Sequence, residues 1–289
     1  MVTYINKGIS FLLPLLLLVS CEKVVLADGE TAQGNLHISA KIVDQIPFDT
    51  KSATRSAVPL SELCSRVSFV LYQDDVRVNY VNQKSDDDNF GNAVMNLPEG
   101  RYSLVVIGHS GATNATTTNI NKITFSGKLT DTFVFCKDIE VSEDTKSVEA
   151  NLTRAVAMVR FVVPDGIPDD AVQLKFYYTG GSSSLDAVTK LGCVESRQTE
   201  YRYVDESNGV YEIYTFPHAT EDALQVKISA LDSGENVLAE QTIEDIPITV
   251  NMITRIIGDL FDGSAATKKF DVSIVADDEW DGVIDYPIK

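Results

Sequence analysis

The sequence is short of positive charge. Its 289 residues include 24 Lys and Arg against 42 Asp and Glu, which gives a formal net charge of -18, and the basic residues form no block. Nucleic-acid binding depends on clustered Lys and Arg that neutralise phosphates, and docking on anionic lipid has the same requirement. The composition therefore argues against both roles.

Cysteine is also scarce, with four residues in the chain. Cys64, Cys136 and Cys193 are far apart, with no CxxC and no Cys/His spacing suited to zinc. In an oxidising compartment one disulfide and one free thiol would be compatible with this set. Apolar and aromatic neighbours favour the other reading, in which all three are buried thiols that pack as small hydrophobes.

Helical periodicity is missing over any ordinary helix length, and period-two alternation replaces it. Apolar residues alternate with polar ones over 36–42, 67–71 and 224–230, as in strands that bury one face. Segments 102–107 and 159–163 are apolar on both faces, like central strands. Short helical turns are expected only near 61–64 and 168–172. The pattern predicts an all-β fold of sandwiches with Greek-key connections.

The one long apolar run lies at the N-terminus. Only Lys7 carries charge before the run at 9–19, which is too short for a comfortable membrane span and is typical of a secretory signal. The run ends in Leu18-Val19-Ser20-Cys21, which resembles the lipobox of bacterial lipoproteins. That resemblance implies a lipoprotein signal peptide at 1–20 and acylation of Cys21, with palmitate among the lipids expected. The alternative is a plain signal peptide with an incidental Cys.

The mature chain is long enough for two domains. Segment 141–148 is polar and charged, and Asn151 to Phe161 reads as a fresh strand. The boundary is therefore expected at residue 150, with an N-terminal β-sandwich over 21–150 and a C-terminal one over 151–289. A softer junction lies at 49–56.

Catalytic signatures are weak. Gly108-His109-Ser110-Gly111-Ala112 approaches the G-x-S-x-G nucleophile elbow but ends in Ala, and no helix pattern follows it. The three histidines, His37, His109 and His218, are far apart and nothing in the sequence singles out a triad. We therefore expect no catalytic residue and no enzymatic activity.

Metal-binding patterns fail in the same way. Segment 277–282 has the carboxylate spacing and the sixth-position Gly of a calcium loop, but its twelfth position is Ile288 in place of a bidentate Glu. The acidic run 86–89 is best explained as a solvated turn. Neither a metal nor a cofactor is predicted.

Tyrosine is clustered in the second half of the chain. A set of exposed rings would offer a platform for carbohydrate, whereas tyrosines at strand spacing more often pack in a core or cover a sheet face. The residues concerned are Tyr177, Tyr178, Tyr201, Tyr203, Tyr211 and Tyr214.

Several short motifs recur in an order that resembles a known family. The chain is similar to the fimbrillin-like superfamily, and more closely to the FimB-type fimbrial anchor and subunit lipoproteins of Bacteroidales type V pili. In chain order, the matching motifs are the lipobox, Arg66-Val67-Ser68-Phe69, Asn96 to Tyr102, Leu152-Thr153-Arg154-Ala155, Tyr178 to Ser182, Asn251 to Thr254, Gly258 to Phe261, and Trp280. Together they extend over nearly the whole mature chain.

The resemblance implies two tandem transthyretin-like β-sandwiches and a structural, non-catalytic role. It implies lipid anchoring in the outer membrane at the cell surface, with other fimbrial subunits as partners through strand exchange. The strand at 36–42 could be displaced if the chain were cut at Arg55, as in the family's polymerising members. Arg55 on a polar linker is also explained as an ordinary loop residue, and the anchor-type members keep their lipid and need no such cut. The other candidate is 270–287, where Val272, Ile274 and Ala276 alternate, although a core strand explains this segment as well. The alternative function is a surface adhesin or glycan-binding module with host or bacterial surface ligands.

Overall fold

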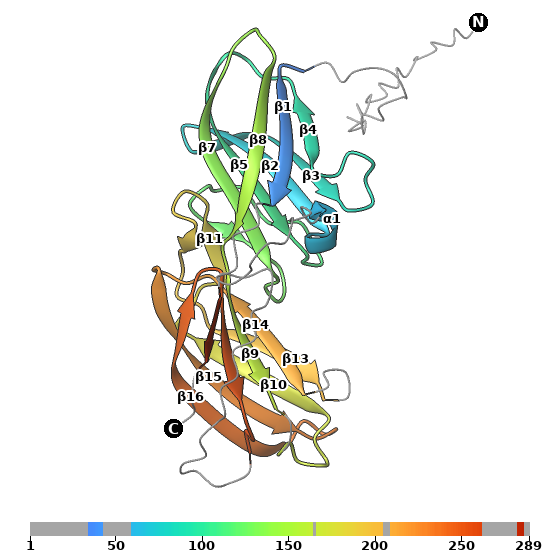
Figure 1. Ribbon diagram of the computed structural model, residues 1–289, viewed down its shortest axis with the longest axis vertical. Helices are drawn as coiled ribbons and strands as arrows, with labels where there is room; N and C mark the ends of the chain where they lie inside the picture. Colours follow the sequence, from blue (N-terminus) through green and yellow to red (C-terminus); the bar gives the residue numbers. More distant parts are fainter. Residues whose placement is uncertain (1–33, 43–58, 164–165, 205–208, 262–281, 286–289) are drawn as a thin grey trace, which may run out of the picture. The chain divides into compact units, whose positions relative to one another are not determined.

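The computed structural model describes residues 34–42, 59–163, 166–204, 209–261 and 282–285. It is nearly all β, with one short helix, α1 (Leu60–Leu63), among the described residues (Figure 1). All of these ranges belong to one compact unit, Gly34–Lys289. Within the described ranges no helix has the length and apolar character needed to cross a bilayer.

The first half of this unit is one seven-stranded sheet that folds back on itself. Its order is β3-β2-β5-β7-β8-β1-β4. The strands are β1 (Leu36–Ile42), β2 (Arg66–Gln73), β3 (Val76–Lys84), β4 (Asn92–Met95), β5 (Gly100–His109), β7 (Thr132–Val141) and β8 (Lys146–Arg154). The rungs between β7 and β8 are confined to Phe133↔Arg154 and Val134↔Thr153. The sheet bends at this short contact, and apolar side chains from both arms enclose one core.

The second half contains two four-stranded sheets, ordered β13-β10-β15-β16 and β14-β9-β17-β18. Their strands are β9 (Ala157–Val162), β10 (Gln173–Thr179), β13 (Gln198–Tyr203), β14 (Val210–Thr215), β15 (Glu221–Leu231), β16 (Val237–Thr249), β17 (Met252–Ile257) and β18 (Gly282–Asp285). A second core joins these sheets, with Phe161 and Phe176 at a ring-centroid distance of 5.2 Å. Each sheet buries one face against the other, the arrangement of a sandwich.

A third core ties the two halves together. Val70 and Ile107 of the first half share an apolar cluster with Phe216 and Ile253 of the second. A small sheet of order β12-β11-β6 also crosses between the halves, formed by β6 (Ile123–Thr124), β11 (Ser184–Asp186) and β12 (Leu191–Gly192). Because β6 belongs to the first half and β11 to the second, backbone hydrogen bonds reinforce the apolar contact.

A buried guanidinium lies at the same junction. Arg154 donates from Nε and Nη2 to the two carboxylate oxygens of Asp131, both at 2.7 Å, and from Nη1 to Asn251 Oδ1 at 2.7 Å. Its guanidinium carbon lies 4.8 Å from the centre of the Phe133 ring. The Arg154 side chain is 3% exposed and that of Asp131 is 21% exposed, so this is a largely buried bidentate pair. It fixes the end of β8 to the turn that precedes β17.

The predicted strands at 36–42, 67–71 and 224–230 are confirmed as β1, β2 and β15, and the helical turn near 61–64 is confirmed as α1. The turn near 168–172 is a simple turn without a helix. The strand expected from Asn151 to Phe161 is wrong in extent, because β8 includes 151–154 and β9 begins at Ala157. The division into two domains at residue 150 stays a prediction.

The three described cysteines are free thiols. Cys64 is buried, and burial raises the pKa of its thiol far above the ordinary value. Cys136 and Cys193 are half-buried, so the expectation of three buried thiols holds for Cys64 alone. A disulfide among them is not formed.

Candidate functional site: strand β1 and its groove

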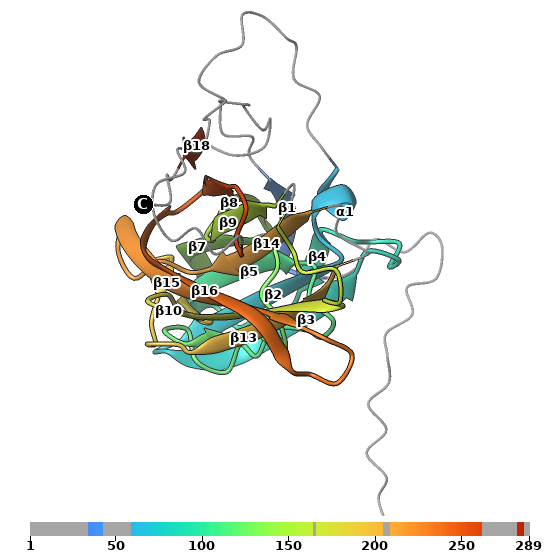
Figure 2. The same ribbon diagram turned by 90° about the horizontal axis from the view of Figure 1, so that it is seen from below.

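Strand β1 lies inside the first sheet between two strands from distant parts of the sequence. It pairs parallel with β8 from Leu36↔Lys146 to Ile42↔Leu152. On its other side it pairs antiparallel with β4 from Leu36↔Met95 to Ser39↔Asn92. Figures 1 and 2 both show β1 beside β8. The first strand of the described chain is thus inserted into the sheet and is not added at its edge.

Alternate side chains of β1 enter the core of the first half. Leu36, Ile38 and Ala40 are 0%, 2% and 7% exposed, respectively, and each belongs to the core cluster of this sheet. Ala150 of β8 and Met95 of β4 lie in the same cluster. Without β1, the two flanking strands would border an apolar groove with unpaired backbone edges, which is the receptor geometry for an added strand.

Polar contacts secure the start of β1. Asn35 donates from Nδ2 to the Leu97 carbonyl at 2.8 Å and accepts from the Leu97 backbone N–H at 2.9 Å. Its carbonyl accepts from the Lys146 N–H at 2.8 Å. Near the other end, the Ala40 N–H donates to the Gly91 carbonyl at 2.7 Å. These bonds connect β1 to β8 and to the loops on either side of β4.

Several residues singled out by the sequence lie outside the described residues. They are the lipidation candidate Cys21, the processing candidate Arg55, the alternating segment 270–281 and Trp280. The last part of the C-terminal candidate is described as β18, which pairs parallel with β17 from Met252↔Gly282 to Arg255↔Asp285. Each candidate exchange strand therefore has one parallel neighbour, which is β8 for β1 and β17 for β18.

The histidines occupy three separate environments. His37 contacts the Gly34 carbonyl through Nε2 at 3.1 Å. His109 is 2% exposed, and its Nδ1 accepts from the Gly111 N–H at 3.0 Å. Burial, followed by the charge of Arg66, lowers the pKa of His109 to about 4. His109 is thus a neutral core residue at physiological pH.

His218 is placed to hold a proton more firmly than an ordinary histidine. Its Nδ1 lies 3.1 Å from Asp222 Oδ2 and its Nε2 lies 3.1 Å from the Val194 carbonyl. Partial burial lowers the pKa of His218, but the bond to the Val194 carbonyl and then the Asp222 carboxylate outweigh it, so the net pKa is raised. The contact with Val194 joins the loop before β15 to the segment after β12.

The serine of the elbow-like motif performs a structural task. Ser110 Oγ donates to the Leu63 carbonyl at 3.1 Å and accepts from the Ser65 N–H at 3.2 Å. The hydroxyl is thereby engaged by the backbone around the end of α1. These contacts connect the end of α1 to the end of β5.

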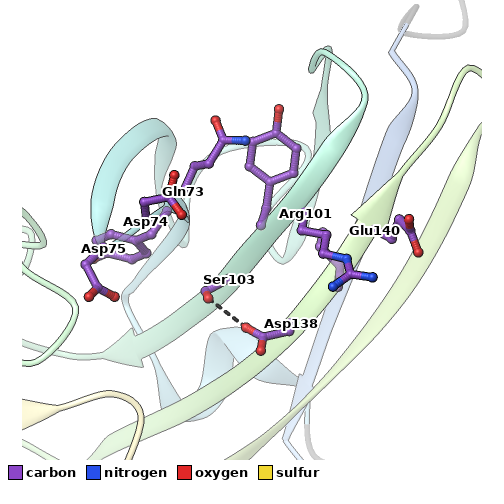
Figure 3. Close-up of a pocket in the computed structure, with 10 residues that line it drawn as sticks. Gln73, Asp74, Asp75, Arg101, Ser103, Asp138 and Glu140 are labelled. Atoms are coloured by element: carbon purple, nitrogen blue, oxygen red, sulfur yellow. Dashed lines mark hydrogen bonds between the residues drawn. The ribbon is translucent and has the colours of Figure 1, made fainter.

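A hollow of about 500 Å³ opens beside the β2–β3 turn (Figure 3). Arg101, Ser103 and Asp138 lie along β5 and β7, and Ser103 Oγ donates to Asp138 Oδ1 at 2.7 Å. Asp74 and Asp75 form the turn with positive φ values of 51° and 63°, which short polar side chains tolerate. Cross-strand pairing and turn chemistry account for these residues.

Carboxylates do not assemble into a metal site within the described ranges, where no group of three or more His, Cys, Asp or Glu is placed to hold an ion. In the acidic run 86–89, Asp87 Oδ2 accepts from the Lys84 N–H at 2.9 Å. The carboxylate therefore stabilises the turn after β3. The calcium-like segment lies outside the described residues over 277–281.

The tyrosines divide between the core and the surface. Tyr178 and Tyr211 are each 1% exposed in the core of the second half. Tyr201 and Tyr203 are 49% and 57% exposed. The sequence placed all of them in one group, and strand alternation separates them, as period two requires. Within β10 Phe176 and Tyr178 are buried, so Tyr177 between them faces outward with Tyr201.

Sequence reasoning missed Asn35 and the partners of Arg154. Asn35 precedes an alternating strand and offers an amide that can satisfy two backbone groups, which is a usable signal. Arg154 stands inside an apolar stretch, and a lone cation there indicates a buried partner. Asp131 lies 23 positions earlier, and nothing local identifies it.

The family model for fimbrillin-A associated anchor proteins Mfa1 and Mfa2 matches residues 34–277. Among curated protein sequences none matches the chain significantly. Three similar solved structures are a candidate adhesin from Bacteroides ovatus, a fimbrial assembly protein from Parabacteroides distasonis and the fimbrial anchor protein Mfa2 from Porphyromonas gingivalis.

The Bacteroides ovatus protein is 15% identical, with a TM-score of 0.49 over 72% of this chain and 81% of its own. The Parabacteroides distasonis protein is 10% identical, with a TM-score of 0.44 over 77% and 89%. The Porphyromonas gingivalis protein is 9% identical, with a TM-score of 0.41 over 71% and 80%.

Proposed function

Because the chain belongs to the family of fimbrillin-A associated anchor proteins Mfa1 and Mfa2, we propose that it is a non-catalytic anchor or accessory subunit of a type V pilus. Its place is the cell surface, and its partners are other fimbrial subunits. The serine and the histidine of the elbow-like segment are engaged in structural contacts, which agrees with a structural role. The observation that carries the proposal is the insertion of β1 between β4 and β8.

The partner contact we propose is exchange of strand β1. The groove that β1 fills has apolar side chains on its floor and a backbone edge on each side. An extended segment of a neighbouring subunit with alternating apolar residues would satisfy both. Cleavage at Arg55 would free β1 to leave, whereas a chain that keeps β1 would offer no open groove to a neighbouring subunit.

The N-terminal attachment we propose is a lipid on Cys21 that holds the chain in the outer membrane. The support is the lipobox-like Leu18-Val19-Ser20-Cys21 after an apolar run. Several acyl chains stabilise membrane attachment without a spanning helix, at about 0.8 kcal/mol for each buried CH₂. Metabolic labelling with palmitate should mark the wild-type protein and leave Cys21→Ala unlabelled; label on the variant would refute this attachment.

We further infer that the architecture is two transthyretin-like sandwiches, one over 21–150 and one over 151–289. Separate cores on the two sides of Arg154 support this organisation. Expression of residues 151–289 alone should yield a cooperatively unfolding protein. Failure of that segment to fold would favour a single indivisible unit.

A cross-link across the groove tests strand exchange. Ser39 of β1 faces Asn92 of β4 in the antiparallel ladder, where facing Cα atoms lie about 4.5–5.5 Å apart, within the range of a disulfide. The double variant Ser39→Cys with Asn92→Cys should retain β1 when oxidised. Incorporation of this chain into isolated pili should fall under oxidising conditions and recover after reduction.

The matched control places the same cross-link where no strand is expected to leave. Arg101 of β5 faces Glu140 of β7, and both are exposed. Arg101→Cys with Glu140→Cys should leave incorporation unchanged in either redox state. Equal incorporation of the oxidised β1–β4 variant and the control would rule out exchange of β1. Arg55→Ala tests processing separately, since it should abolish any fragment that begins at residue 56.

A further inference from the structure

The outer face of the β13-β10-β15-β16 sheet carries aromatic rings that the fold does not use. The inner face of this sheet packs Phe176, Tyr178 and Ile228 into the core. Tyr201 and Tyr203 point away from that core and are 49% and 57% exposed. Exposed tyrosines provide large, rigid, amphipathic contact area at low entropic cost.

The strand register arranges these residues in rows across the sheet. Tyr201, Lys175, Ser229 and Glu240 face one another in sequence across all four strands. The next row places Tyr177 directly opposite Lys227. Neighbouring members of a row have Cβ atoms about 4.5–5.5 Å apart. Each row therefore combines one tyrosine with polar side chains on the neighbouring strands.

The polar part of this face is organised by hydrogen bonds. Glu240 accepts from Ser229 Oγ at 2.9 Å and pairs with Lys227 Nζ at 2.8 Å. Hydrogen bonds from Lys227 and then Ser229 hold the pKa of Glu240 below its usual range, so the carboxylate is ionised. Donors and acceptors are thus held on the same sheet face as the tyrosines, with Lys227 directly opposite Tyr177.

A hollow of about 430 Å³ lies over these rows. Its lining contains two cations and two anions, so its charges balance: Lys175, Lys227, Glu235 and Glu240. A polyanion would gain little at a balanced site and would be repelled by the net charge of -18 on the whole chain. The electrostatics favour an uncharged ligand.

A peptide strand is a poor fit for the same face. The backbone groups of β10 and β15 are already paired on both sides in ladders, so an added strand would have no main-chain partners. Recognition has to come from side chains that combine apolar ring faces with hydrogen-bond donors and acceptors. An uncharged, hydroxyl-rich molecule with apolar C–H faces satisfies both demands.

We propose that the outer face formed by Tyr177, Tyr201, Lys175 and the Ser229–Glu240 pair is a binding site for a neutral saccharide. Sugar rings lie against the tyrosines, and their hydroxyls bond to Lys175 and Glu240. This function goes beyond assembly, and it does not depend on strand exchange or lipid attachment. A failure here leaves the fimbrial proposal intact.

The test uses the full chain and a glycan array of neutral hexose and N-acetylhexosamine oligosaccharides, with uronic-acid oligosaccharides as the acidic comparison. The strongest neutral probe is then titrated by calorimetry. Tyr201→Ala and Tyr177→Ala should each weaken binding about three- to tenfold, the size expected for one aromatic contact. Their thermal unfolding should match that of the wild type because the altered rings lie outside the core.

The matched control is Tyr80→Ala on β3, since Tyr80 is also 49% exposed and lies on a different sheet. It should leave the affinity unchanged. The proposal is overturned if the wild type binds no neutral probe, if it prefers the uronic acids, or if Tyr201→Ala and Tyr80→Ala behave alike.

Discussion

The buried pair between Arg154 and Asp131 offers a test of how the two halves of the molecule are joined. Removing the guanidinium leaves the Asp131 carboxylate, whose side chain is 21% exposed, without its bidentate donor. Loss of one partner from a buried ion pair costs about 3–5 kcal/mol. The cost falls at a junction that both halves share through Asn251.

Arg154→Ala is therefore expected to lower the free energy of unfolding by about 3–5 kcal/mol. With a urea m-value of about 3 kcal/mol/M, at the upper end for small proteins, the unfolding midpoint should fall by about 1–2 M. Arg154→Lys keeps the charge but loses the bidentate geometry, so its unfolding midpoint should lie between those of the wild type and Arg154→Ala. Urea titration followed by circular dichroism measures all three.

Two controls separate the ion pair from simple loss of volume. Asp131→Asn alone and the double variant with Arg154→Ala complete a thermodynamic cycle, and the coupling energy should be at least about 1 kcal/mol for groups in direct contact. The wild type should unfold in one transition, and Arg154→Ala should separate the transitions of the two halves. A loss below about 1 kcal/mol, or additive effects, would refute the account of this junction.

Three further outcomes follow from buried and paired groups. Burial lowers the pKa of His109 to about 4, so the unfolded chain binds the extra proton first as the pH falls. The free energy of unfolding should therefore fall by about 3 kcal/mol as the pH drops from about 6.5 to 4. His109→Asn should flatten that slope in pH-dependent urea melts, and an unchanged slope would contradict the prediction. His218 has a raised pKa, so its contribution is complete below its unfolded pKa of about 6.5 and is lost as the pH rises through the folded value; Asp222→Asn should remove this loss. Ile38→Ala should cost about 2–5 kcal/mol through the cavity it opens, whereas loss of the exposed Lys41–Glu149 pair should cost under about 1 kcal/mol; equal costs in thermal melts would mean that β1 is not packed as described.

The strands were predictable where one face is buried, because burial of alternate residues imposes period two on the sequence. Leu36, Ile38 and Ala40 show this plainly, and their burial is confirmed. Their partners were not predictable, since β8 begins at Lys146, far along the chain, and register across such a distance depends on the packed core. The sequence therefore identified the strand but not its insertion.

The extent of β8 was misread for a physical reason. Ala155 and Val156 lie between β8 and β9, where a turn usually carries polar residues. Both are fully buried in the core that joins the two halves. The chain therefore passes from β8 to β9 without the polar residues that usually mark a turn. The six tyrosines of the second half were also misread as one group. Strand alternation divides them, because some rings face the core and others face the surface.

The parallel pairing of β1 with β8 has a mechanical consequence. The N-terminal end of β1 leads to the proposed membrane attachment, and the C-terminal end of β8 leads through Arg154 to the second half of the molecule. Tension between those two ends pulls neighbouring parallel strands in opposite directions along their axes. All the rungs from Leu36 to Ile42 then resist sliding together, whereas a force across the strands would open them one at a time. An anchored chain would thus hold against steady traction yet release β1 when it is peeled from one end.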